Sequence, residues 1–132
     1  MELRESFREL AAYRTVEGVG AEPAELMKMA LDGARTFLLQ AEAAIAEHDR
    51  PRKARVLNSA AHLIEFMLGL AGIEHGPLSE RLAEVYRYVL AAILKGNVWD
   101  DAQAVAAGRV ALEELAAVWR KVFPDTPARE NV

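Results

Sequence analysis

Apolar residues recur at intervals of three and four along most of the chain, which is the spacing of one face of an α-helix. This pattern predicts four helices of roughly twenty residues each, over about 23–47, 50–71, 78–95 and 100–123. We find no segment with the two-residue alternation of a strand. Because the connectors are short, consecutive helices should run in opposite directions. The sequence therefore predicts an all-α fold, an antiparallel up-down four-helix bundle with a short N-terminal helical or extended segment.

Residues at the expected helix ends support these boundaries. Asp49 is placed to cap the second helix, and Pro51 suits its first turn, where a missing N–H does no harm. Gly96 and Asn97 predict a left-handed end to the third helix. Asp100 then lies at the positive end of the last helix, which favours a carboxylate.

The apolar stripes are wider than a helix packed on one side requires, which is about 100°. On the third helix the stripe covers roughly half of the circumference and consists of Leu78, Leu82, Val85, Tyr86, Val89, Leu90, Ile93 and Leu94. One explanation is a helix that touches two neighbours inside a bundle. The other is a groove that accepts the amphipathic helix of a partner. The pattern alone leaves both open.

Composition narrows the class of protein. The chain has 132 residues, enough for one domain, with 52% hydrophobic residues and no cysteine. Its formal net charge is −4, and we find no basic cluster, so we expect no nucleic-acid partner. The charged N-terminus does not resemble a secretory signal, and no apolar run predicts stable membrane insertion. We expect a cytoplasmic protein.

Candidate chemistry is sparse. Of the three histidines, His62 alone lies within a predicted helix, with Glu65 three residues later. One such pair does not make the paired motifs of a di-metal bundle. A phosphotransfer role for His62 stays as an alternative, although the residues after it do not fit that motif. We therefore expect a binding module that is not an enzyme, without catalytic residues, metal ligands or a cofactor.

Gly33 is unusual, because glycine inside a helix costs about 1 kcal/mol relative to alanine. Close contact between two helices of the bundle would explain it. Close approach of a partner backbone is the alternative explanation.

Several short motifs occur in a fixed order, each weak alone. They are formed by Tyr13 and Val16 in AYRTVEGV, by Pro23, Glu25 and Leu26, by Asp32, Gly33, Ala34, Phe37 and Leu38 in ALDGARTFL, by Glu65, Phe66 and Leu70, by Leu82, Val85, Tyr86 and Tyr88, and by Val118 and Trp119. With them the chain resembles the flagellar secretion chaperone FliS family from about Ala12 to Val122. It departs from the family pattern at Glu22, Leu31, Gly108 and in the loop GIEHGPLSE, which bears on individual groove contacts.

The resemblance implies a chaperone that binds the C-terminal segment of flagellin in the cytoplasm. Such a chaperone prevents premature polymerisation and assists delivery to the flagellar type III export apparatus. The alternative is a helical adaptor for a different flagellar or secreted client. The sequence leaves the oligomeric state open, a homodimer included.

The resemblance also implies a division of the chain. We expect a single domain over 1–132, with 1–22 as a cap segment over a groove, 23–123 as the bundle and 124–132 as a flexible tail. The residues assigned to the cap and groove are Tyr13, Val16, Leu26, Met29, Ala30, Gly33, Phe37, Ile64, Met67, Tyr86 and Leu90.

Overall fold

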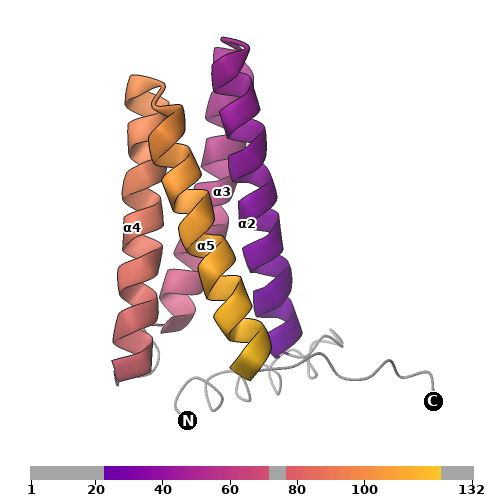
Figure 1. Cartoon of the computed structure of the whole chain (residues 1–132), viewed down its shortest axis with the longest axis vertical. Helices are drawn as coiled ribbons and strands as arrows, with labels where there is room; N and C mark the ends of the chain where they lie inside the picture. Colours follow the sequence, from indigo (N-terminus) through magenta and orange to yellow (C-terminus); the bar gives the residue numbers. More distant parts are fainter. Residues whose placement is uncertain (1–22, 72–76, 123–132) are drawn as a thin grey trace, which may run out of the picture.

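The computed structural model describes residues 23–71 and 77–122. Within them lie four α-helices, α2 (Pro23–Ala46), α3 (Arg50–Ala71), α4 (Pro77–Trp99) and α5 (Ala102–Val122). Figure 1 shows them side by side, with chain direction alternating from one helix to the next. The predicted all-α four-helix bundle is confirmed. The predicted cap segment 1–22 and tail 124–132 lie outside the described residues.

Each helix packs mainly on two neighbours. α2 contacts α3 and α5, and α4 contacts the same two helices. Consequently α2 and α4 are diagonal to each other, as are α3 and α5. The bundle has four sides, which we name by their helix pairs: the α2/α3, α3/α4, α4/α5 and α2/α5 sides.

Two tight turns join the helices at one end of the bundle, and aspartates organise both. Asp49 Oδ1 accepts a hydrogen bond from the Arg52 amide at 3.2 Å, which confirms the predicted cap of α3. Asp101 Oδ1 accepts one from the Ala104 amide at 3.0 Å and caps α5 in the same way. Because these carboxylates satisfy amides that lack a partner within the helix, both helices begin sharply.

The predicted end of the third helix at Gly96 and Asn97 is wrong. α4 continues to Trp99, and the residue with left-handed backbone is Asp100, with φ 53°. Gly96 has a packing role instead: a Cβ there would lie 2.3 Å from Val105 Cγ2. The glycine therefore lets α5 approach α4 closely, rather than supplying a positive φ.

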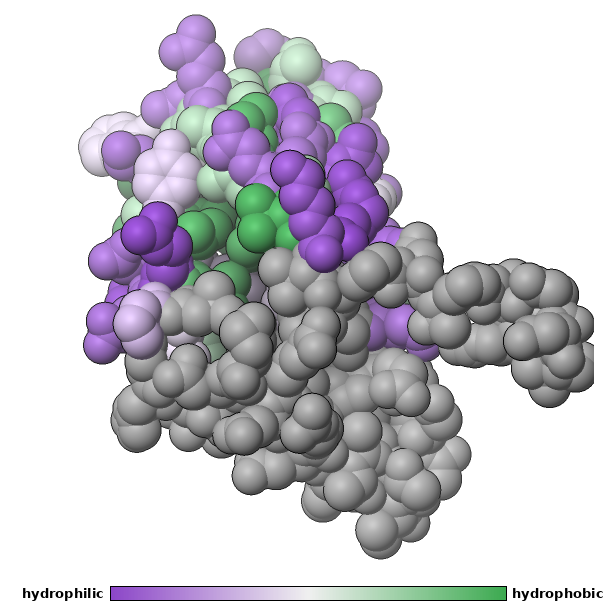
Figure 2. Space-filling model, turned by 60° about the horizontal axis from the view of Figure 1, so that its bottom comes forward, coloured by the Kyte–Doolittle hydropathy of each residue, from purple (hydrophilic) through white to green (hydrophobic). Residues whose placement is uncertain are grey.

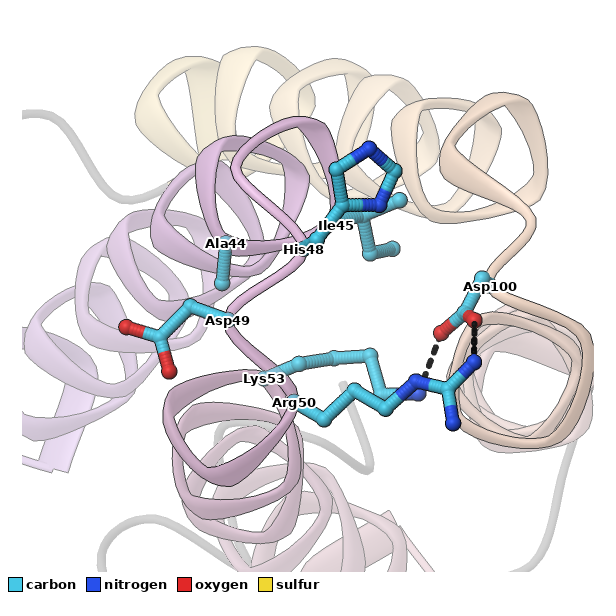
Figure 3. A pocket seen from close by; sticks show the side chains of 7 residues that line it. All are labelled: Ala44, Ile45, His48, Asp49, Arg50, Lys53 and Asp100. Atoms are coloured by element: carbon cyan, nitrogen blue, oxygen red, sulfur yellow. Dashed lines mark hydrogen bonds and ion pairs between the residues drawn. The ribbon is translucent and has the colours of Figure 1, made fainter.

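A buried lysine ties the two turns together (Figure 3). Lys53 is almost fully enclosed; its Nζ donates to the Asn97 carbonyl at 2.9 Å and to the carboxylate of Asp100. Arg50 adds a longer contact of 3.5 Å to the same carboxylate. The hydrogen bond from Lys53 lowers the pKa of Asp100, so this carboxylate stays ionised. The start of α3 is thereby fixed to the end of α4.

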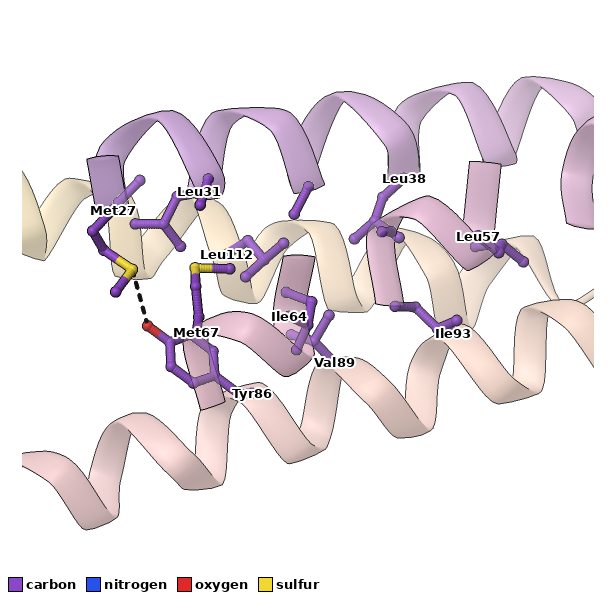
Figure 4. Close-up of a cluster of buried hydrophobic side chains, with 14 of the residues drawn as sticks. Met27, Leu31, Leu38, Leu57, Ile64, Met67, Tyr86, Val89, Ile93 and Leu112 are labelled. Atoms are coloured by element: carbon purple, nitrogen blue, oxygen red, sulfur yellow. Dashed lines mark hydrogen bonds between the residues drawn. The ribbon is translucent and has the colours of Figure 1, made fainter. Parts of the chain in front are cut away.

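The core contains both small and large side chains. Ala41, Ala44 and Ala60 are fully buried. Met27, Leu57 and Tyr86 are large and equally enclosed (Figure 4). The Tyr86 hydroxyl is enclosed, and it donates to Met27 Sδ at 3.8 Å. Thioether sulfur is a weak acceptor, so packing rather than hydrogen bonding holds this ring.

Glycine substitutions test the close packing of α4 and α5. We expect Gly96→Ala to lower the free energy of unfolding by about 1–3 kcal/mol, because Val105 is stiff and has no room to move. Gly69→Ala is the matched control, since nothing lies within 4 Å of its added Cβ. It should stabilise the fold by about 0.5–1 kcal/mol. Urea unfolding of both variants checks this, and equal stabilities would contradict the packing role of Gly96.

Tyr86 gives the fold a dependence on high pH. Burial raises the pKa of Tyr86 above its ordinary value of 10.0. Above that pH the unfolded chain loses the phenol proton while the native chain keeps it. The free energy of unfolding should therefore fall as pH rises past 10, by up to about 1.4 kcal/mol per pH unit from this group.

Tyr86→Phe isolates this contribution. At neutral pH the variant should match the wild type within about 1 kcal/mol, because the hydroxyl makes only a weak bond. Above pH 10 its stability should decline less steeply in urea titrations. Identical slopes for the two proteins would exclude Tyr86 as the group responsible.

Candidate functional site

The α2/α5 side is charged. Arg35 Nε lies 2.8 Å from Glu113 Oε2, and Arg109 binds both Glu42, at 2.6 Å, and Glu113, at 3.0 Å. The hydrogen bond from Arg35, joined by one from Arg109, lowers the pKa of Glu113. The Arg35–Glu113 pair is exposed, and such pairs contribute about 0–1 kcal/mol each, whereas the Arg109–Glu42 pair is partly buried. Charged side chains therefore dominate this side of the bundle.

The α2/α3 side is apolar. On α2, Leu26, Met29, Gly33 and Phe37 follow one another at spacings of three and four, so they lie along one edge of the helix. On α3 the corresponding row is Leu63, Phe66 and Leu70. Met29 is 63% exposed and Phe66 is 42% exposed, while the other side chains of the two rows, Gly33 aside, are half-buried against the core or beside it.

Gly33 fixes the register of these two rows. A Cβ at Gly33 would lie 3.2 Å from Leu63 Cδ1, so α2 and α3 meet there. Because the helices are antiparallel, Met29, one turn before Gly33, comes beside Phe66, almost one turn after Leu63. The two exposed side chains therefore lie near each other on the α2/α3 side, and we call this pair the apolar lip. The contact with Leu63 also supports the first explanation of Gly33, close packing within the bundle.

The other residues assigned from the sequence divide into two groups. Ala30, Ile64, Met67 and Tyr86 are buried inside the bundle, where the last three lie together (Figure 4). Leu90 is half-buried on α4.

The structure thus brings Leu26, Met29, Gly33 and Phe37 onto one side, with Ile64, Met67 and Tyr86 behind that surface. Tyr13 and Val16 lie outside the described residues. The rows add Leu63, which we had not assigned to the site, and give exposed Phe66 a place on the lip. The signal for both in the sequence is the spacing of three and four that joins Leu63, Phe66 and Leu70.

A second set of exposed apolar side chains lies on α4. Leu94, Val98 and Trp99 are mostly exposed in its last turns, and Tyr88 is half exposed. In the upper, coloured part of Figure 2, apolar surface (green) is visible between hydrophilic side chains (purple). Exposed apolar side chains that lie close together often mark protein–protein contact sites.

Two other kinds of site find no support in residues 23–71 and 77–122. No three histidine, aspartate or glutamate side chains in this part of the chain come close enough to hold a metal ion. No helix there is long and apolar enough to cross a membrane. The arrangement that remains is suited to non-covalent contact with an apolar partner surface.

Comparison with known proteins adds to this picture. The chain matches the model of a family described as flagellar protein FliS over residues 7–126. It is 29% identical over 115 residues to the flagellar secretion chaperone FliS of Salmonella typhimurium. The aligned residues make up 86% of this chain and 85% of that protein. The family match spans all four described helices and hence both apolar surfaces.

Proposed function

Because the chain belongs to the FliS family of flagellar secretion chaperones, we propose that it binds the C-terminal segment of flagellin in the cytoplasm. By covering that segment, it prevents premature polymerisation and assists delivery to the flagellar export apparatus. The observation that carries this proposal is the apolar lip of Met29 and Phe66 on the α2/α3 side.

The physical need for such a surface follows from the client. A filament subunit carries terminal segments that become helical only in the polymer, and their apolar faces would otherwise meet in free solution. An amphipathic helix binds a hydrophobic groove through residues spaced by three and four positions. The two rows on the α2/α3 side have this spacing. The role of every residue in them is contact, and no chemical step is involved.

The proposed site has a surface and a support. Leu26, Met29 and Phe37 contact the client directly. Gly33 keeps the two helices close enough for Leu63 to fill the space between the rows.

Behind this surface, the buried Ala30, Ile64, Met67 and Tyr86 hold the rows in place, and Leu90 extends the support to α4. Tyr13 and Val16 are proposed as a displaceable cap over the same surface.

Calorimetry with a peptide of the last several dozen residues of the host flagellin tests the proposal. We expect one peptide per chaperone and a strongly negative heat-capacity change, because apolar area leaves water on binding. A matched peptide with the apolar residues replaced by serine serves as the control. Absence of heat at several temperatures, with both partners at micromolar concentrations, would exclude tail capture.

A single substitution locates the binding surface. Phe66→Glu should weaken tail binding at least about tenfold, because it places a charge within the apolar lip. Val110→Glu is the matched control, since Val110 is also 42% exposed but lies on α5, away from the α2/α3 side. Circular dichroism should show both variants folded. Equal losses in the two variants would mean that the α2/α3 side is not the binding surface.

A further inference from the structure

The methionines of the described residues differ sharply in exposure. Met27 is 2% exposed and Met67 is 0% exposed, and both point into the core (Figure 4), whereas Met29 is 63% exposed. Met1 lies outside the described residues. A dissolved oxidant reaches a buried side chain only when the fold opens locally. Met29 is therefore far more accessible to oxidation than Met27 or Met67.

Met29 also has a central place on the surface proposed for the client. Leu26 and Gly33 are its neighbours along the same edge of α2, and Phe66 of α3 lies near it on the α2/α3 side. The flexible, polarisable thioether of methionine adapts well to the surface of a partner. The most exposed side chain of the two apolar rows is thus also one whose polarity an oxidant can change.

The chemistry is a two-electron oxidation by a peroxide. The sulfur of Met29 attacks one oxygen of hydrogen peroxide with a lone pair, so that an S–O bond forms and the O–O bond breaks. The departing hydroxide takes up the proton of the transferred oxygen and becomes water. Sulfur is oxidised to the sulfoxide, and the peroxide is reduced.

The sulfoxide should affect client binding and leave the fold intact. Oxidation converts a flexible apolar side chain into a polar one. In the free chaperone the exposed position of Met29 lets the new oxygen remain hydrated. An apolar client that covers the lip would remove this water, and burying a polar group without a hydrogen bond is unfavourable.

We propose that Met29 is a site of oxidative modification, and that its conversion to the sulfoxide by a peroxide weakens the binding of the client. The second half of this proposal rests on the proposed function. The change is reversible, because methionine sulfoxide reductases, one for each epimer of the sulfoxide, restore the thioether. The α2/α3 side thus contains a redox-sensitive contact.

The modification site is tested on the chaperone alone. The full chain is treated with dilute hydrogen peroxide, and mass spectrometry of its proteolytic peptides follows the sulfoxide at each methionine over time. We expect Met29 to be oxidised at least about tenfold faster than Met27 and Met67, because these two require local opening. Circular dichroism on the same samples confirms that the fold persists.

The effect on binding is tested by calorimetry with the flagellin tail peptide, before and after treatment, with the peroxide removed before the peptide is added. The wild type should lose affinity about tenfold. Met29→Leu should keep the affinity that it has before treatment, because leucine carries no sulfur. Met27→Leu is the matched control: it conserves volume at a buried methionine and should lose affinity as the wild type does. Treatment with both reductases should restore the wild-type affinity.

Three results would overturn the proposal. The first is oxidation of Met29 at the same rate as Met27 and Met67. The second is unchanged affinity after full conversion of Met29. The third is an equal loss of affinity in Met29→Leu and the wild type, which would assign the effect to another side chain, such as the exposed Trp99. Absence of tail binding before treatment would instead refute the proposed function, and mass spectrometry would still decide the modification site.

Discussion

The structure depends on how much of each helix its neighbours can cover. A helix in a four-membered ring packs mainly on two others, which encloses only part of its circumference, whereas several helices here carry apolar residues over a wider arc. The inner part of each arc forms the core around Tyr86, Ile64 and Leu112. The outer part stays exposed at the edges, as Met29 and Phe66 on one side and Trp99 on the other. The apolar side chains left exposed at these edges thus belong to the same stripes whose inner parts fold the bundle.

Polar contacts determine which sides of the bundle keep exposed apolar surface. The arginines and glutamates of the α2/α5 side keep it hydrated, and Lys53 holds α3 against the end of α4 next to the turns. A buried lysine is tolerated there because a carbonyl and a carboxylate satisfy its ammonium group. With both turns fixed, the apolar rows of the α2/α3 side are held in place next to the core.

The fold class, the four helices and the cap by Asp49 followed from apolar spacing and local residue chemistry, because these signals act within a few residues. The end of α4 did not follow from the sequence, because Gly96 is required by its packing against Val105 on α5. Only the tertiary structure reveals this contact. For the same reason a helical wheel could not separate Met67, enclosed in the core, from Met29, exposed on the lip. Spacing identifies an apolar face; which part of it remains accessible depends on how far the neighbouring helix reaches.

The burial of the α2/α3 rows has a consequence for affinity. Leu26, Phe37 and Leu63 are already half-buried in the folded bundle, so a client that covers them removes only the remaining area from water. Apolar area contributes about 25 cal/mol per Å², and an ordering tail loses about 1–2 kcal/mol of backbone entropy per residue. Met29 and Phe66, the most exposed side chains of the two rows, therefore offer the most apolar area to a client. Under the proposed function, the limited area moderates the net binding energy, which suits a client that must later be released.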